Sequence, residues 1–192
     1  MSTLYVDTIT EKTAGNGVQI ADLVPKAGSV VQVVQEYITD VHSYNAVITS
    51  PVATALTASI TPKSASSKIL VMIQGSFSAP NNNHVSQVLK RTIGGSTVDV
   101  GLATNSGNRP ANTGTSSAQI STQQFADFQY ALWHSVVQFL DTPSTTSQIT
   151  YQLYWGGYTA TQIYLNRTVG DRTGGTYDPR STSSVTLMEI AQ

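Results

Sequence analysis

The segment Lys68-Ile-Leu-Val-Met-Ile-Gln-Gly-Ser-Phe77 decides the fold class of this chain. Its residues alternate as in a β-strand, in which successive side chains point to opposite faces. One face is lined by four apolar side chains, Ile69, Val71, Ile73 and Phe77. Leu70 and Met72 make the other face apolar as well. Because a strand with two apolar faces is typical of a buried position, we expect it at the centre of a sheet or at a subunit contact.

Similar patterns extend in both directions along the chain. Short apolar runs end at clusters of Gly, Pro, Asn or Ser, and helical periodicity is almost absent. The sequence predicts further strands at 29–37, 53–61, 84–93, 97–102, 131–140, 149–155, 162–165 and 185–190. We therefore predict an all-β fold, an antiparallel two-sheet β-sandwich of a jelly-roll-like type, because two apolar sheet faces can bury each other.

Turn signals and polar stretches separate these strands. Gly94-Gly95 predicts a hairpin, and Gly156-Gly157 is interpreted as a turn towards the strand at 162–165. Two polar segments, 103–124 and 166–184, are predicted to be long loops. Loops of that length in a compact domain are usually functional or partly disordered.

The composition narrows the possible functions. The chain has 192 residues, enough for one domain plus an appendage, and 11% of them are charged, against roughly 25% in an average protein. Hydrophobic residues make up 40%, which argues against disorder. The net charge of −1 gives no electrostatic footprint for nucleic acid, and the absence of cysteine excludes disulfides. No apolar run approaches the ~20 residues needed to insert into a membrane.

Residues 1–25 form a segment of their own. Leu4 and Val6 alternate with polar neighbours, Gly15-Asn16-Gly17 predicts a turn, and Val18 and Ile20 follow. Such a short β-ribbon is marginal in water unless it packs on something else. We therefore expect an N-terminal attachment ribbon (1–25), a linker (26–28) and a C-terminal sandwich (29–192). The segment lacks the basic and apolar regions of a signal peptide, so we expect the chain to fold where it is made.

The run Leu-Tyr-Val-Asp-Thr-Ile-Thr-Glu-Lys-Thr, at residues 4–13, resembles the N-terminal signature of tail-fibre and other virion structural proteins of tailed bacteriophages, especially phages of aquatic bacteria and cyanobacteria. The segments 26–35, 60–71, 89–93 and 185–190 resemble the knob domains of the same group. The resemblance spans nearly the whole chain and does not separate tail from head.

The resemblance implies a non-enzymatic role in the virion, with assembly in the bacterial cytoplasm. Proteins of this kind are typically homotrimers, so the first expected partner is a copy of the chain itself. A second is another phage structural protein of tail or capsid, and a third is a host-surface saccharide. The residues expected to insert into, or pair with, the phage partner are Leu4, Val6, Ile9, Val18 and Ile20.

Two other interpretations stay open. The chain has no long shaft between anchor and knob, which favours a head decoration, cement or head-fibre protein as the alternative. A free-standing lectin or a small depolymerase is a more distant one.

The sequence offers little support for catalysis or cofactor binding. His42, His84 and His134 have no metal-ligand spacing, and we interpret them as structural, with no cofactor expected. Among the acids, Asp171 and Asp178 share one loop and could form a glycosidase pair, but loop acids are usually solvated. Asp127 and Asp141 flank strands, and we read them in the same way. Asn166-Arg167-Thr168 matches the glycosylation pattern, here interpreted as chance.

A cluster of aromatic residues between 151 and 164 is the best candidate for recognition. By alternation Tyr151 and Trp155 belong to the core. Tyr and Trp outside the core stack on sugars and dominate binding surfaces. The candidate receptor-binding residues are Tyr154, Tyr158, Tyr164, Arg167, Asp171 and Arg172. The patch at 125–130 is a further candidate for an oligomer contact, or for a strand edge folded into the core.

Overall fold

The computed structural model describes residues 25–47, 49–80, 84–104, 107, 110–117, 128–157 and 161–192. These residues form eleven strands and one short 3₁₀ helix, η1 (Phe128–Tyr130). The strands are β1 (Val30–Ile38), β2 (His42–Ala46), β3 (Val52–Ile60), β4 (Lys68–Ser78), β5 (His84–Ile93), β6 (Ser96–Val100), β7 (Gly114–Ser117), β8 (Trp133–Asp141), β9 (Ile149–Gly157), β10 (Thr161–Leu165) and β11 (Ser183–Ile190). Over the described ranges, no helix is long and apolar enough to cross a membrane.

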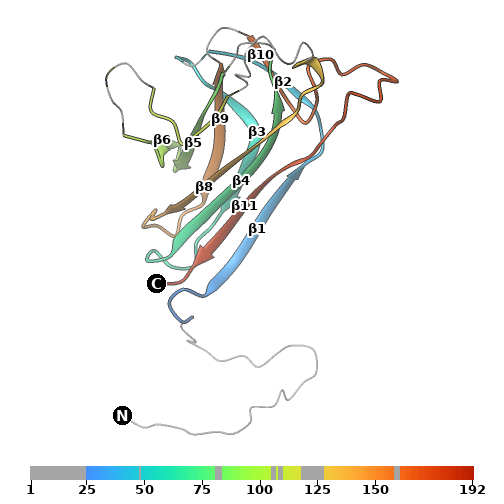
Figure 1. Ribbon diagram of the computed structural model, residues 1–192. Coiled ribbons are helices and arrows are strands. Elements are labelled where there is room, and N and C mark those ends of the chain that lie inside the picture. The colour runs from blue at the N-terminus through green and yellow to red at the C-terminus, as the bar shows by residue number, and fades with distance from the viewer. Residues whose placement is uncertain are drawn as a thin grey trace, which may run out of the picture.

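The strands form two antiparallel sheets that pack face to face (Figure 1). In the first sheet the order is β1-β11-β4-β10-β2, and β8 pairs with the other edge of β4. In the second sheet the order is β3-β9-β5-β6, and β7 also pairs with β5. The predicted fold class, an all-β antiparallel two-sheet sandwich, is therefore confirmed.

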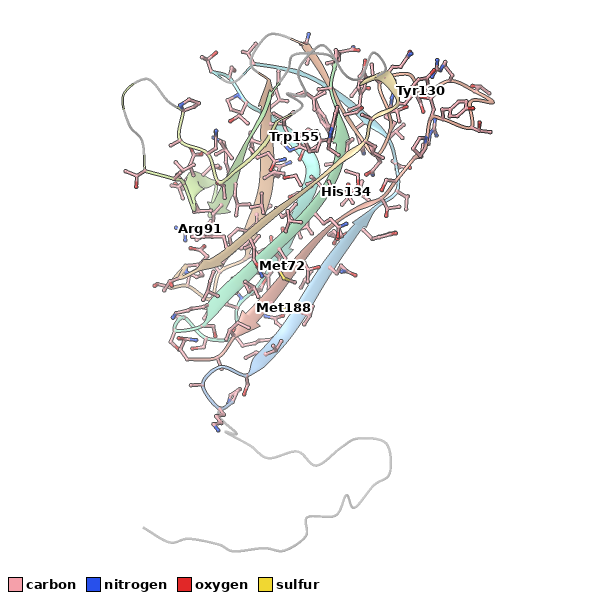
Figure 2. The ribbon with its side chains drawn as sticks, in the orientation of Figure 1. Met72, Arg91, Tyr130, His134, Trp155 and Met188 are labelled. Carbon is pink, nitrogen blue, oxygen red and sulfur yellow. The ribbon has the colours of Figure 1, made fainter. Side chains whose placement is uncertain are left out.

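The core lies between the two sheets and follows the predicted alternation. On β4, Ile69, Val71, Ile73 and Phe77 are all buried. On β9, four buried residues face them, Ile149, Tyr151, Leu153 and Trp155. Trp155 is the largest fully buried side chain, and its ring meets that of Phe77 edge-on at 5.5 Å between centroids. Figure 2 shows Trp155 in the interior, where large aromatic side chains contribute most to burial.

The Gly94-Gly95 hairpin is confirmed, and its backbone explains the glycines. Ile93 pairs with Ser96, which leaves a two-residue turn between β5 and β6. Both glycines have positive φ angles, 56° and 81°, as a type I′ turn requires. Only glycine adopts this conformation without steric cost.

Two expectations about the strands and loops need correction, and one strand was not predicted. Gly156-Gly157 is not a turn, because β9 runs through both glycines, which pair with Ser86 and Val85 of β5. The polar stretch 103–124 is not all loop, because it contains β7. The sequence also gave no sign of β2, a short strand that pairs with β10.

Both faces of β4 carry apolar side chains, and among the described residues the inner face packs in the core while the outer face is only partly covered. On the outer face, Leu70 and Met72 are half-buried. On the neighbouring β8, Val136 and Leu140 are exposed. The sequence predicted apolar residues on both faces of 68–77 and 131–140. In the structure, the outer of these two faces is partly exposed to solvent.

The chain enters the sandwich at one end, and the long loop 166–182 lies at the other end. β1 and β11 are antiparallel, with Val30 opposite Ile190 at one end and Ile38 opposite Ser183 at the other. The predicted linker lies at the first end, where Gly28 N–H donates to the Ala191 carbonyl. The long loop 166–182 leads into β11 at the second end (Figure 1). The predicted attachment ribbon lies almost wholly outside the described residues.

Candidate functional site at the loop end of the sandwich

The loop 166–182 contains no strand, yet hydrogen bonds fix it to the sandwich, beginning with Asn166 at its root. Asn166 is fully buried and has a φ of 62°, in the left-handed region that Asn tolerates better than most residues. Its amide nitrogen donates to the carbonyls of Ile38 (2.9 Å) and Asp40 (3.0 Å). Its amide oxygen accepts from Ser183 Oγ at 2.6 Å. Asn166 therefore joins the loop to β1 and β11, and its burial closes the Asn-Arg-Thr motif to glycosylation in the folded chain.

Asp178 organises the middle of the loop. Its carboxylate accepts from Thr168 Oγ1 at 2.7 Å. It also accepts from the backbone N–H of Arg172 at 3.2 Å and from Arg172 Nε at 2.8 Å. The hydrogen bond from the Arg172 side chain is the main reason that the pKa of Asp178 is lowered to about 2. Asp178 is therefore an ionised structural anchor, the opposite of the proton donor that a glycosidase needs.

A second ionic group lies around Asp171. Its carboxylate accepts two hydrogen bonds from Arg180, from Nε at 3.1 Å and from Nη2 at 3.2 Å. Arg167 approaches the same carboxylate at 3.4 Å. The Arg167 guanidinium also lies over the ring of Tyr164, 4.2 Å from its centroid, as in a cation–π contact. Tyr164, Arg167 and Asp171 thus form one continuous group with Arg180.

Aromatic residues complete the site from a distant part of the chain. The Arg172 guanidinium lies 4.3 Å from the ring centroid of Tyr130, which belongs to η1. The rings of Tyr130 and Tyr177 meet edge-on, 5.9 Å apart. The backbone N–H of Gly170 donates to the Gln129 carbonyl at 2.9 Å and holds η1 against the loop. Tyr177 is 73% exposed, and Figure 2 shows Tyr130 beside the loop that leads into β11.

We refer to these residues together as the loop-end cluster. Its members are Tyr130, Tyr164, Arg167, Asp171, Arg172, Tyr177, Asp178 and Arg180. Three arginines and two aspartates give it a formal charge of +1. Four of the six residues that the sequence selected for receptor binding are among its members, Tyr164, Arg167, Asp171 and Arg172.

Tyr154, which the sequence also selected, lies elsewhere. Tyr154 is on β9, between the core residues Leu153 and Trp155, so it faces outward from the second sheet. Lys90 lies over its ring at 4.8 Å. Tyr164 faces outward from the first sheet, so these two tyrosines lie on opposite surfaces of the sandwich.

Several predicted residues fall outside the part of the chain that the structure describes. Tyr158 is one of them. The five predicted docking residues also fall there, Leu4, Val6, Ile9, Val18 and Ile20.

The sequence reasoning did not include four members of the cluster among the receptor-binding candidates. Tyr177, Asp178 and Arg180 lie in the loop that the sequence had singled out, and the density of charged residues there is a signal that could have selected them. Tyr130 lies more than thirty residues from Tyr164 along the chain. Only the packing of η1 against the loop brings it to the site, and no spacing rule predicts that contact.

The other candidates for chemistry have structural partners. His134 is exposed on β8, and its Nδ1 is 2.9 Å from Ser76 Oγ. Asp141 is buried, and Arg91 Nη1 donates to both of its carboxylate oxygens, at 2.9 and 2.8 Å. It also accepts a hydrogen bond from the Tyr151 hydroxyl, so it joins β8 to the second sheet. Asp127 lies outside the described residues.

The loop-end cluster places tyrosine rings next to charged side chains. Tyrosine rings offer apolar faces, and the arginines and aspartates beside them offer hydrogen-bond donors and acceptors in fixed positions. No protein-family model matches the chain, and no curated protein is significantly similar to it.

Proposed function

We propose that this chain is a non-enzymatic virion structural protein of a tailed bacteriophage, a tail fibre or spike. In this proposal the N-terminal segment docks on the particle, and three copies of the sandwich form a knob that recognises the host surface. The observation that carries the proposal concerns β1 and β11. The chain enters the sandwich at one end of these two strands, and the loop-end cluster lies at their other end.

The geometry of β1 and β11 supports this separation of roles. The chain enters the sandwich beside Val30, opposite Ile190, and the loop 166–182 enters β11 at Ser183, opposite Ile38. The eight residues of β11 span about 26 Å at the usual rise per residue of a strand. A domain held at the first end therefore presents the loop-end cluster away from its point of attachment.

The chemistry of the cluster favours a saccharide as the ligand. Tyr177 is exposed and can stack on a sugar ring, while Arg180 and Arg172 lie at the surface as hydrogen-bond donors. The hydrogen bonds through Asn166 and Asp178 fix the loop before any ligand arrives. A site that is already ordered loses less entropy on binding, which favours recognition by shallow contacts.

The proposed docking partner is another phage structural protein of the tail or capsid. The resemblance of residues 4–13 to virion proteins supports this part of the proposal. Leu4, Val6, Ile9, Val18 and Ile20 would supply the apolar contacts, and main-chain pairing would add affinity.

Immunogold labelling of intact particles, with antibody raised against the purified full-length chain, tests the location. Label at the tail tip or along the tail would support the proposal. Label over the head would replace it with the head decoration or head-fibre alternative, with the N-terminal segment as a capsid-binding clasp. Particles that stay unlabelled while the antibody still recognises the protein from disrupted virions would place the epitope inside the particle and refute surface recognition. Absence of the protein from disrupted virions as well would overturn every virion interpretation.

Binding to host cells tests the site itself. Tyr177→Ala and Arg180→Gln should each lower retention of the purified chain on host cells several-fold. Tyr154→Ala is the matched control, because Tyr154 is also an outward tyrosine with a cation over its ring but lies on the opposite surface. Equal losses for Tyr177→Ala and Tyr154→Ala would contradict the assignment of the ligand site to the loop end.

A depolymerase is the enzymatic alternative, and the state of the two loop carboxylates opposes it. Arg172 keeps Asp178 ionised, and Arg180 and Arg167 pair with Asp171. Asp171→Asn and Asp178→Asn variants, assayed for glycan cleavage beside the unchanged chain, distinguish the two functions. Cleavage by the unchanged chain that either variant abolishes would establish the enzyme.

A further inference from the structure

The outer face of the first sheet carries apolar side chains that stay exposed in the described part of the chain, among them Val33, Val136 and Leu140. Where β1, β11, β4 and β8 lie side by side, their register places outward residues in straight rows across all four strands. The first row is entirely apolar, and it consists of Val33, Met188, Leu70 and Leu140. Met188 and Met72 are seen side by side on this face in Figure 2.

Two more rows continue the face towards the loop end. One contains Gln35, Thr186, Met72 and Gln138, and the next contains Tyr37, Ser184, Gln74 and Val136. Val136 is 69% exposed and Leu140 is 49% exposed. Isolated exposed apolar residues are ordinary on protein surfaces, but a contiguous apolar patch marks an interaction site.

None of the twelve residues in these three rows is charged. Within these three rows a copy of the same face can approach without like-charge repulsion, and Lys68 lies one row beyond Leu70 at the margin of the face. The uncharged glutamine, serine and threonine side chains can hydrogen-bond to their own kind, since amides and hydroxyls are both donors and acceptors. A surface for a strongly acidic or basic partner would instead carry complementary charge.

The size of the face suits a stable contact between proteins. Four strands at the usual spacing are about 19 Å wide, and nine residues of strand are about 30 Å long. The flat footprint of the whole outer face, which includes outward residues such as Lys68 beyond the three rows, is then roughly 600 Å² per copy, before side-chain relief adds to it. Specific interfaces begin at about 600 Å² per partner.

We propose that the outer face of β1, β11, β4 and β8 is the contact surface between copies of this chain. This contact surface deepens the proposed function, because it assigns an interface to the expected trimer. The contact can be tested on the free protein, without the phage particle. In this arrangement the half-buried Leu70, Met72 and Met188 become the centre of a subunit interface.

The mass of the full-length chain in solution, from size-exclusion chromatography with light scattering, tests the proposal. The unchanged chain should have about three times the 20.4 kDa mass of one chain. Val136→Lys and Leu140→Lys should each shift the mass towards a single chain at the same concentration. Both side chains are already solvent-exposed, so the fold should tolerate lysine, and an unchanged circular dichroism spectrum checks this. Val136→Gln should act in the same direction but more weakly, because it adds no charge.

Val98→Lys is the matched control. Val98 is also an exposed valine in a strand, 44% exposed, but it lies on β6 of the second sheet. This variant should keep the mass of the unchanged chain. A monomeric unchanged chain would overturn the proposal and leave the face to the N-terminal segment or to a foreign partner. An oligomer that Val136→Lys and Leu140→Lys leave intact would overturn it as well, because the contact would then lie elsewhere. Either result leaves the immunogold test of the proposed function unaffected.

Discussion

Replacing Asn166 with alanine should destabilise the fold more than any surface substitution in the same region. The change removes the three hydrogen bonds of a buried side chain, two donated by the amide nitrogen and one accepted by the amide oxygen. At about 1 kcal/mol net for each bond, the loss is about 3 kcal/mol. Alanine must also adopt the left-handed backbone conformation at φ 62°, which costs about 1 kcal/mol. The expected loss in the free energy of unfolding is therefore about 4 kcal/mol.

Urea unfolding followed by tryptophan fluorescence, at a fixed chain concentration, measures this loss. With an m-value of about 2 kcal/mol/M, the midpoint of Asn166→Ala should fall by roughly 2 M urea. Asn45→Ala is the control, because Asn45 is an exposed asparagine on β2, and such changes usually stay within about 0.5 kcal/mol. If both variants unfold within 1 kcal/mol of the unchanged chain, Asn166 does not anchor the loop as argued.

Three other predictions concern stability. Asp178 has a pKa of about 2 in the folded chain, below its ordinary value, so its stabilising effect is complete above that ordinary value and is lost as the pH falls from about 4 towards 2; an acid titration of the urea midpoint should show this loss, and Asp178→Asn should flatten it. Burial alone would raise the pKa of Glu189, but hydrogen bonds from Ser67, Gln32 and two backbone N–H groups outweigh it and lower the pKa. Glu189→Gln replaces one accepting oxygen with an amide NH2 group and leaves at least one of these partly buried donors without its acceptor, which should cost about 2 kcal/mol in urea unfolding at neutral pH. Gly94→Ala should lower the free energy of unfolding by about 1 kcal/mol because its φ is positive, and a loss below 0.3 kcal/mol would contradict the type I′ assignment.

The sequence predicted the long strands because their side chains alternate strongly. Ile69 to Phe77 on β4 and Ile149 to Trp155 on β9 face each other across the core as expected. It failed at β7, Gly-Thr-Ser-Ser, which has no apolar alternation, and at β2, His-Ser-Tyr-Asn-Ala, where only Tyr44 and Ala46 alternate towards the core. These strands exist because β10 and β5 offer free edges with unpaired backbone groups, which is a tertiary effect.

The turn expected at Gly156-Gly157 failed for a related reason. Glycine pairs usually signal turns, but here the backbone of β5 continues past them and offers hydrogen bonds to both residues. Pairing with a formed neighbour strand outweighs the local preference of glycine for turns. The same dependence on tertiary structure separates Tyr154 from Tyr164, since the sheet that each strand joins decides which surface its side chains occupy.

β11 connects the loop-end cluster to the proposed subunit contact. Ser183 receives the loop, and Met188 lies five residues later in the apolar row of the outer face. If copies associate through that face around an axis parallel to β11, every loop-end cluster lies at one end of the assembly and every N-terminal segment leaves at the other. Several weak contacts to repeated host saccharides would then act together, and multivalent binding can exceed a single contact by about 100-fold or more. Val136→Lys should therefore reduce retention of the protein on host cells even though Val136 lies outside the cluster. If Val136→Lys is a single chain and is still retained as well as the unchanged protein, one loop-end cluster is enough for binding and the multivalent argument is wrong.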